Sequence, residues 1–265
     1  MSRVCALLLC ATSVAACAAR VPPRPTGASA PDPSAIEAFA AATTACKGVR
    51  TFTGALRLSG RAGTEKLRGT LLTGLAAPAS VRFEAVAPFG QPIFILAGRD
   101  NRATLLLPRD NRVLPDASLS AVLERLTGVN LSASDLRLVL TGCLADAASP
   151  TDGKSWPGGW QSVTIAGASG EPITAYLRLV NGTRVVAAAD HGAWRIDYDD
   201  HANGFPRSVR LRSAGSTPVD LSAAIDELQV NAGLDDKAFD VAVPASAAKM
   251  SLDDLRSVAP LRDVK

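Results

Sequence analysis

The sequence predicts a mainly β (α+β) protein, with about ten to twelve strands in a meander and about three helices. Two observations predict this class: short alternating or strongly apolar runs recur between turn residues, and leucines take a helical spacing only in brief stretches. The 265 residues are 47% hydrophobic, which is enough for a core and excludes wholesale disorder. The net charge of +3 is too small for a dedicated nucleic-acid binder, so no nucleic-acid partner is expected.

The N-terminus has the features of an export signal. A short basic segment, Met1–Arg3, precedes an apolar run from Val4 to Ala15, which is too short to span a bilayer but typical of a secretory signal. The run leads to Cys17 through small residues, an arrangement that resembles the bacterial lipobox. We expect removal of residues 1–16 and acylation of Cys17, by palmitate or a similar chain. The alternative is an ordinary signal peptide cut after a small residue, with Cys17 incidental.

Residues 17–33 are predicted to be a lipidated cysteine followed by a tether. Positions 18–33 contain five prolines and little apolar content. In polyproline II these residues would span about 50 Å, at ~3.1 Å per residue. The remaining chain, 34–265, is predicted to be one domain that stands off the membrane. No second apolar segment approaches spanning length, so Cys17 is the only membrane attachment expected.

Two cysteines remain after the signal and the anchor are assigned. Cys46 and Cys143 would lie in an oxidising compartment, where such a pair favours one disulfide. Cys46 ends the first predicted helix and Cys143 ends the third, so the bond would join helix to helix. The alternative is two buried small hydrophobic side chains. Neither has a histidine close in sequence, and no metal site is expected.

The body is predicted element by element. A helix over 32–46 opens with Asp-Pro-Ser, a good helix start. Strands are predicted near 52–60, 67–74, 81–86, 92–97, 102–107 and 112–114. Two helices follow, 117–126 ending at Gly128 and 134–142 ending at Gly142, with Ser132 or Ser134 as the cap of the second. Residues 149–159 are predicted to be a loop. Strands resume at 162–166, 173–180, 184–190, 194–198, 208–211 and 219–230, with Asn181-Gly182 as a hairpin turn, and a short helix lies near 252–256.

Recognisable catalytic chemistry is missing from the sequence. No nucleophile elbow, zinc-protease helix, phosphate loop or dinucleotide fingerprint is present. His191 and His201 lie beside aspartates in turn-like stretches, so we expect them to be solvated turn residues. An enzyme is not expected, and neither is a cofactor. The remaining enzymatic hypothesis is a hydrolase that uses one of these histidines.

Between residues 49 and 142 the chain resembles the LolB-like outer-membrane lipoprotein receptors and related lipoproteins of the LolA/LolB type. The segments that carry the resemblance are 81–92 (VRFEAVAPFGQP), 105–107 (LLL), 119–131 (LSAVLERLTGVNL) and 136–142 (LRLVLTG). Their order is the evidence, since no single motif is highly specific. The resemblance implies a strongly curved antiparallel half-barrel whose concave face is covered by helices. Between sheet and helices it implies an apolar cavity that receives acyl chains.

The resemblance also implies a function: a monomeric carrier on the periplasmic face of the outer membrane. It would take the acyl chains of lipoproteins or lipids from a soluble periplasmic chaperone. Ala18, where an aspartate would favour the inner membrane, fits an outer-membrane location. The loop Pro88, Phe89 and Gly90 corresponds to the family's membrane-insertion loop. The alternative function is a structural or assembly lipoprotein with the same fold and no ligand.

The predicted cavity residues are taken from the apolar alternation of the strands and the leucine faces of the helices. A shift of one residue would turn each strand residue to the opposite face. The candidates are Phe83, Ile93, Ile95, Leu105, Leu107, Leu123, Leu126 and Leu140. The chain departs from the receptors in its C-terminal extension from about residue 232 and in the Cys46/Cys143 pair.

Overall fold

The strands form one large curved sheet built from two meanders. The computed structural model describes residues 24–87, 92–144, 149–167, 170–258 and 261. The first meander consists of β2 (Thr51–Ala62), β3 (Glu65–Ala76), β4 (Ser80–Val86), β5 (Phe94–Arg99), β6 (Arg102–Leu107) and β7 (Arg112–Ser118). The second consists of β8 (Thr151–Trp156), β9 (Trp160–Ala166), β10 (Pro172–Val180), β11 (Thr183–His191), β12 (Trp194–Ala202), β13 (Phe205–Ser213) and β14 (Val219–Val230).

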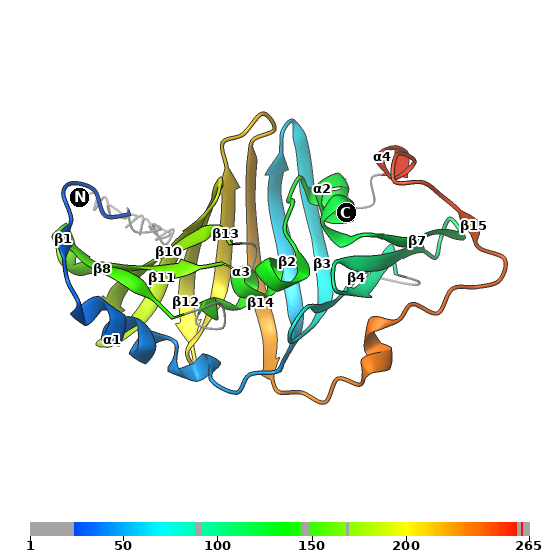
Figure 1. Ribbon diagram of the computed structural model, residues 1–265. Helices are drawn as coiled ribbons and strands as arrows, with labels where there is room; N and C mark the ends of the chain where they lie inside the picture. The colour runs from blue at the N-terminus through cyan, green and yellow to red at the C-terminus, as the bar shows by residue number, and fades with distance from the viewer. Residues whose placement is uncertain (1–23, 88–91, 145–148, 168–169, 259–260, 262–265) are drawn as a thin grey trace, which may run out of the picture.

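The two meanders join where the last strand of the second, β14, pairs antiparallel with the first strand of the first, β2. Figure 1 shows these long central strands standing upright, with the shorter strands curving away on either side. Two-residue strands complete the edges: β1 (Ala30–Pro31) pairs with β8, and β15 (Ala248–Lys249) pairs parallel with β7. The sheet thus has fifteen strands within the described residues.

The mainly β prediction is confirmed, whereas the count of ten to twelve strands is too low. The two edge strands are too short to leave a hydrophobic period in the sequence. β8 lies in the segment 149–159 that was predicted to be a loop because of its proline and glycines. Its burial is shallow, and it is stabilised by backbone pairing with β9. The hairpin at Asn181-Gly182 is confirmed, since both residues have positive φ between β10 and β11.

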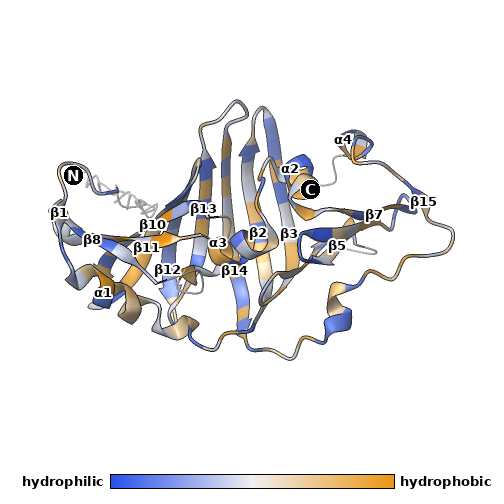
Figure 2. Ribbon diagram, in the orientation of Figure 1, coloured by the Kyte–Doolittle hydropathy of each residue, from blue (hydrophilic) through white to orange (hydrophobic). Residues whose placement is uncertain are grey.

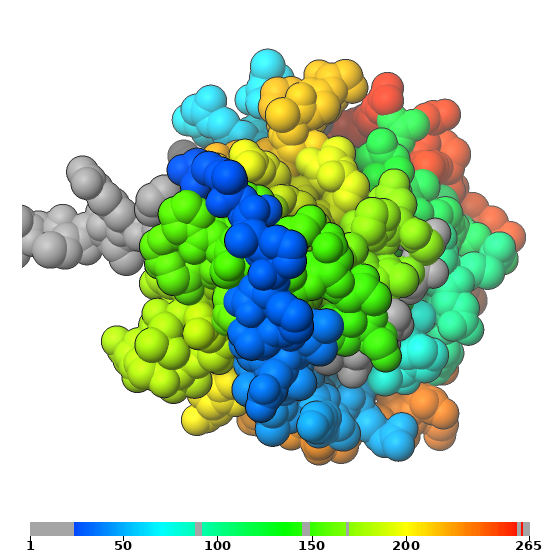
Figure 3. Space-filling model, turned by 60° about the vertical axis from the view of Figure 1, so that its left-hand side comes forward, coloured from blue at the N-terminus to red at the C-terminus, as the bar shows by residue number. Residues whose placement is uncertain are grey.

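Helices cover the concave face. They are α1 (Ser34–Ala42), α2 (Leu119–Thr127) and α3 (Ala133–Thr141), while the short α4 (Leu255–Val258) contacts α2. Figure 1 shows α2 and α3 in front of the central strands, and Figure 3 shows α1 lying across β8 and its neighbours. Hydrophobic and hydrophilic residues alternate along the central strands in Figure 2, as expected when one face packs on helices and the other meets solvent.

Local signals position α2 and α3 as predicted. The Ser118 hydroxyl accepts the N–H of Ala121 at the start of α2, and Ser132 caps α3 in the same way. Gly128 and Gly142 end these helices with φ of 75° and 69°, a left-handed conformation that favours glycine. Within the described ranges, no helix has both the length and the hydropathy needed to cross a bilayer.

The N-terminal segment packs on the sheet instead of extending through residue 33. The guanidinium of Arg24 donates to the carbonyls of Ala189 and Ile196, 3.0 and 2.9 Å away, and forms ion pairs with Asp190 and Asp197. β1 then adds to the edge of the sheet. Residues 24–33 therefore do not form the extended tether that the prolines predicted, because Arg24 pairs with the buried Asp197 and the half-buried Asp190, which the sequence does not place near it.

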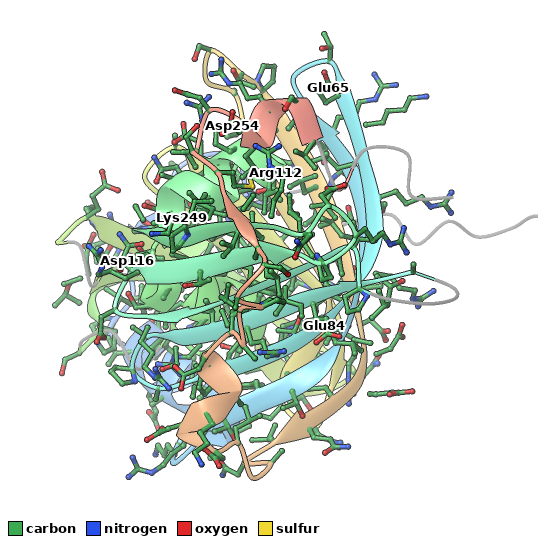
Figure 4. The ribbon with its side chains drawn as sticks, turned by 90° about the vertical axis from the view of Figure 1, so that its right-hand side faces the viewer. Glu65, Glu84, Arg112, Asp116, Lys249 and Asp254 are labelled. Carbon is green, nitrogen blue, oxygen red and sulfur yellow. A yellow bond between two sulfur atoms is a disulfide. The ribbon has the colours of Figure 1, made fainter. Side chains whose placement is uncertain are left out.

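The C-terminal extension wraps around the sheet edge. After β14, the 3₁₀ turn η4 (Asp236–Phe239) packs against the strands β4 and β5. The chain then pairs with β7 through β15 and reaches α2 through α4. Figure 4 shows this path from the side, with Asp254 of the extension beside Arg112 of β7.

Candidate functional site

An apolar cavity of about 90 Å³ lies between the sheet and the helices α2 and α3. Strands of both meanders, both helices and the C-terminal extension form its wall. Among the described lining residues, Thr127 alone has a polar side chain, and its hydroxyl already donates to the Leu123 carbonyl at 2.8 Å. The lining residues are Leu56, Leu58, Leu71, Phe83, Phe94, Leu96, Leu123, Leu126, Thr127, Val129, Leu136, Val139, Leu140, Val209, Leu211, Leu221, Ala223 and Leu261.

This lining decides which chemistry the cavity can accept. A ligand with a hydrogen-bonding group would lose its water there without gaining a protein partner, which costs free energy. Methylene and methyl groups incur no such penalty and gain from leaving water. The cavity is therefore suited to hydrocarbon.

Four of the eight predicted cavity residues line this wall: Phe83, Leu123, Leu126 and Leu140. They come from β4 and from the leucine faces of α2 and α3. The 3.6-residue period identified the helix residues correctly because the sheet lies on one side of each helix. The loop residues Pro88, Phe89 and Gly90 lie outside the described residues.

The other four predicted residues do not line the cavity. Ile93 and Ile95 are half-buried, whereas Phe94 and Leu96 are buried and face the cavity. The predicted alternation of inward and outward side chains in β5 is therefore wrong by one residue. The register contains the missing signal: Phe83 of β4 lies opposite Leu96, and directly opposed residues share a face.

Leu105 and Leu107 lie deeper in the core. Leu105 is opposite Leu96, on the cavity side of the sheet. Both leucines are fully buried among other side chains, so they fill the core beside the cavity and do not reach its wall. The prediction placed Leu105 and Leu107 on the correct face of the sheet. The alternation of apolar residues does not distinguish a side chain that packs in the core from one that lines a cavity.

The sequence gives no sign of the central strands' contribution to the wall. Leu56, Leu58, Val209, Leu211 and Leu221 come from β2, β13 and β14. They meet because β14 pairs with β2, with Leu221 opposite Gly60 and Ala223 opposite Leu58. This pairing joins segments about 170 positions apart, as the Arg57–Asp226 bridge shows, and no local pattern predicts it.

The predicted disulfide is present and holds the C-terminal end of α3. Cys46 ends the 3₁₀ turn η1 (Thr44–Cys46), and Cys143 follows the cap of α3. Their Cα atoms are 5.4 Å apart, within the usual range for a disulfide. The bond thus fastens a cavity helix to the N-terminal segment.

His191 and Asp135 form an ion pair at the N-terminal end of α3. The prediction that His191 is a solvated turn residue is therefore wrong. His191 is only 5% exposed, and its Nε2 lies 3.5 Å from Oδ1 of Asp135 in the first turn of α3. The Asp135 contact raises the pKa of His191, and His191 in turn lowers the pKa of Asp135. The turn starts one residue later, at Gly192, so His191 still belongs to β11 and lies under the helix.

His201 has a different environment. Its Nε2 is 3.0 Å from the carbonyl of Val186, and burial lowers its pKa. Among the described residues, no group of three or more His, Cys, Asp or Glu side chains is placed to hold a metal ion.

Comparisons with known proteins identify the fold. No protein-family model matches the chain, and no curated protein matches it. Among solved structures, a LolA superfamily protein from Nitrosomonas europaea is similar, with a TM-score of 0.52 and 12% identity over 78% of this chain and 97% of that chain. A putative outer membrane lipoprotein-sorting protein domain from Vibrio parahaemolyticus gives a TM-score of 0.47 at 10% identity. A DUF1329 family protein from Desulfovibrio piger gives 0.48 at 11% identity, and both cover 78% of this chain and 96% of theirs.

The curved sheet with helices over an apolar cavity therefore defines a known class of fold. It is the LolA/LolB-type fold, as the segments over 49–142 predicted. At 12% identity the likeness concerns the fold alone, so function has to be argued from the cavity.

Proposed function

We propose that this protein is an envelope lipoprotein that binds the acyl chains of lipoproteins or lipids in the apolar cavity. The observation that supports this proposal is a cavity wall made almost entirely of hydrocarbon, located between the sheet and α2 and α3. Each methylene that leaves water contributes about 0.8 kcal/mol. An acyl chain in transit between membranes gains this stabilisation only inside such an apolar container. The proposal is a binding and transfer role, without catalysis.

The membrane part of the proposal rests on the N-terminus. We propose that acylated Cys17 anchors the protein and that Ala18 favours the outer membrane. Transfer would then run from a soluble periplasmic chaperone to this anchored receiver, and the Phe89 loop would help to deliver cargo to the bilayer. The fold that this chain shares with a LolA superfamily protein supports the proposal.

Ligand binding is tested on the mature protein purified gently from its membrane. Native mass spectrometry would show a co-purified lipid, and a fluorescent fatty-acid probe would bind and be displaced by palmitate. The variant Val209→Phe places a ring in the cavity wall and is expected to weaken probe binding by about tenfold or more. The control Val185→Phe makes the same change at a buried position outside the cavity, and should bind like the wild type.

The alternative structural role predicts the opposite result. If no lipid co-purifies and no probe binds, the carrier proposal fails and the cavity is only a packing defect. The transfer step has its own test, which is to deplete the protein and locate the other lipoproteins of the cell. Normal placement of all of them would reject the transfer step while leaving lipid binding to the first assay.

A further inference from the structure

Leu261 lies in the wall of the cavity although it belongs to the C-terminal extension. It is 2% exposed, and its carbonyl accepts the N–H of Arg68 in β3 at 3.2 Å. β4 pairs with β3 only from Thr70 onward, so the start of β3 has an edge that Leu261 can use. Gly69 makes room, because a Cβ there would lie 3.3 Å from Cδ2 of Leu261.

Leu261 also lines a second cavity. It has a volume of about 160 Å³, and Leu126 and Leu261 line both cavities. Four of its other lining residues carry charge, namely Glu65, Glu124, Arg125 and Arg256, and the rest are Ala62, Leu67, Gly128, Thr217 and Leu255. Leu126 and Leu261 therefore lie at the boundary that the two cavities share; the apolar cavity is called the inner compartment below, and the cavity with the charged residues the outer compartment.

The inner compartment is too small for a full-length membrane acyl chain. A water site needs roughly 10–15 Å³ by the same measure, so about 90 Å³ corresponds to roughly six to nine water-sized units. A methylene is about the size of a water, so the inner compartment accepts only a short hydrocarbon. Because Leu126 and Leu261 line both cavities, a longer chain that extends into the outer compartment passes these two side chains.

We propose that Leu261 sets the length of acyl chain that this protein binds, which rests on the proposed function. The tail of the chain occupies the inner compartment, and the charged wall of the outer compartment faces the polar head. With Leu261 in place, short chains fit and long chains bind only after its side chain moves. Leu261 is thus a specificity-determining residue supplied by a segment about 30 positions beyond the last long strand, β14, which ends at Val230.

The test measures chain-length preference by displacing a fluorescent fatty-acid probe with octanoate, laurate and palmitate. Leu261→Ala is expected to raise affinity for palmitate about tenfold, because the burial of fewer than two further methylenes of the longer chain is enough for a tenfold gain. The affinity for octanoate should change by less than about twofold, because the shorter chain already fits the inner compartment. Leu126→Ala removes the other half of the partition from a different element, and should act in the same direction. Phe239→Ala is the control, since it also removes a buried side chain of the extension but lies against β4 and β5, away from the cavity.

The outcomes separate this proposal from the one on which it rests. If the wild type binds no fatty acid, the proposed function fails. If the wild type binds but neither leucine variant changes the ratio of palmitate to octanoate affinity, Leu261 does not set chain length. An equal gain for all three acids, or the same gain in Phe239→Ala, would also overturn the proposal, because either result indicates general loosening of the extension.

Discussion

Removing the Cys46–Cys143 disulfide should cost this protein a large part of its stability. The bond closes a loop across 97 positions, and the chain-entropy relation gives about 4.7 kcal/mol for a loop of ~100 residues. Natural domains are stable by about 5–15 kcal/mol in total, so this contribution is large. With a urea slope of about 3 kcal/mol/M, the unfolding midpoint of the double variant Cys46→Ala/Cys143→Ala should fall by about 1.5 M.

Tryptophan fluorescence in urea measures this midpoint, since Trp156, Trp160 and Trp194 are all at least partly buried. Wild type treated with a reductant should move toward the midpoint of the double variant, and the double variant should not respond to the reductant. A shift of less than about 0.3 M would be under 1 kcal/mol and would refute the loop-closure reasoning. A shift of the expected size, together with increased fatty-acid exchange, would support a role of the bond in holding α3 over the cavity.

Two further predictions concern buried charges. The pKa of His191 is raised in the folded state, chiefly by Asp135 and also by Glu171. Protonated His191 therefore contributes to stability fully at a pH below the ordinary histidine pKa of 6.5, and the contribution is lost as the pH rises through the pKa of the folded state. The lowered pKa of Asp135 works at the acid end, where its contribution is lost as pH falls through the folded value. Urea midpoints give the difference in stability between wild type and His191→Gln, and this difference should be larger near about pH 5.5 than near about pH 8.5. An equal difference at the two pH values would contradict the ion pair between His191 and Asp135. Arg24→Ala should cost about 1.5–3 kcal/mol, because it removes charged hydrogen bonds to the buried Asp197, which keeps its ion pair with Arg212. Limited proteolysis should then cleave the N-terminal segment sooner, and unchanged cleavage would show that Arg24 does not hold it in place.

Elements whose determinants are local could be predicted from the sequence. The serine cap and glycine end of α3 lie within a few residues of the helix they delimit, so Gly142 marked its end correctly and the cap was narrowed to Ser132 or Ser134, of which Ser132 is the one observed. The disulfide was predictable for another reason: compartment and cysteine number leave few pairings. The phase of β5 was not predictable from its own residues, since Ile93, Phe94, Ile95 and Leu96 are all apolar and any alternation fits them.

The parts that could not be predicted depend on pairing over long distances. The cavity wall needs β14 beside β2, and the sequence of neither strand specifies the other. The same holds for Arg24, whose partners Asp190 and Asp197 are more than 160 positions away, and for His191, whose burial depends on α3. Local sequence patterns predict that polar residues beside turns are exposed to solvent. That prediction fails for His191 because α3, which is distant in sequence, covers it.

The two cavity helices, α2 and α3, are held in place by interactions of different strength. α3 is held at one end by a disulfide and at the other by a buried ion pair. α2 contacts the C-terminal extension through the ion pair of Arg125 with Asp253, whose side chains are 25% and 86% exposed, and such an exposed pair contributes at most about 1 kcal/mol. Withdrawing the extension from α2 therefore breaks an exposed ion pair, whereas moving α3 breaks a disulfide or the buried contact of Asp135 with His191. Leu261 belongs to that extension and lines both cavities, so the weaker attachment lies on the side of the residue that is proposed to set chain length.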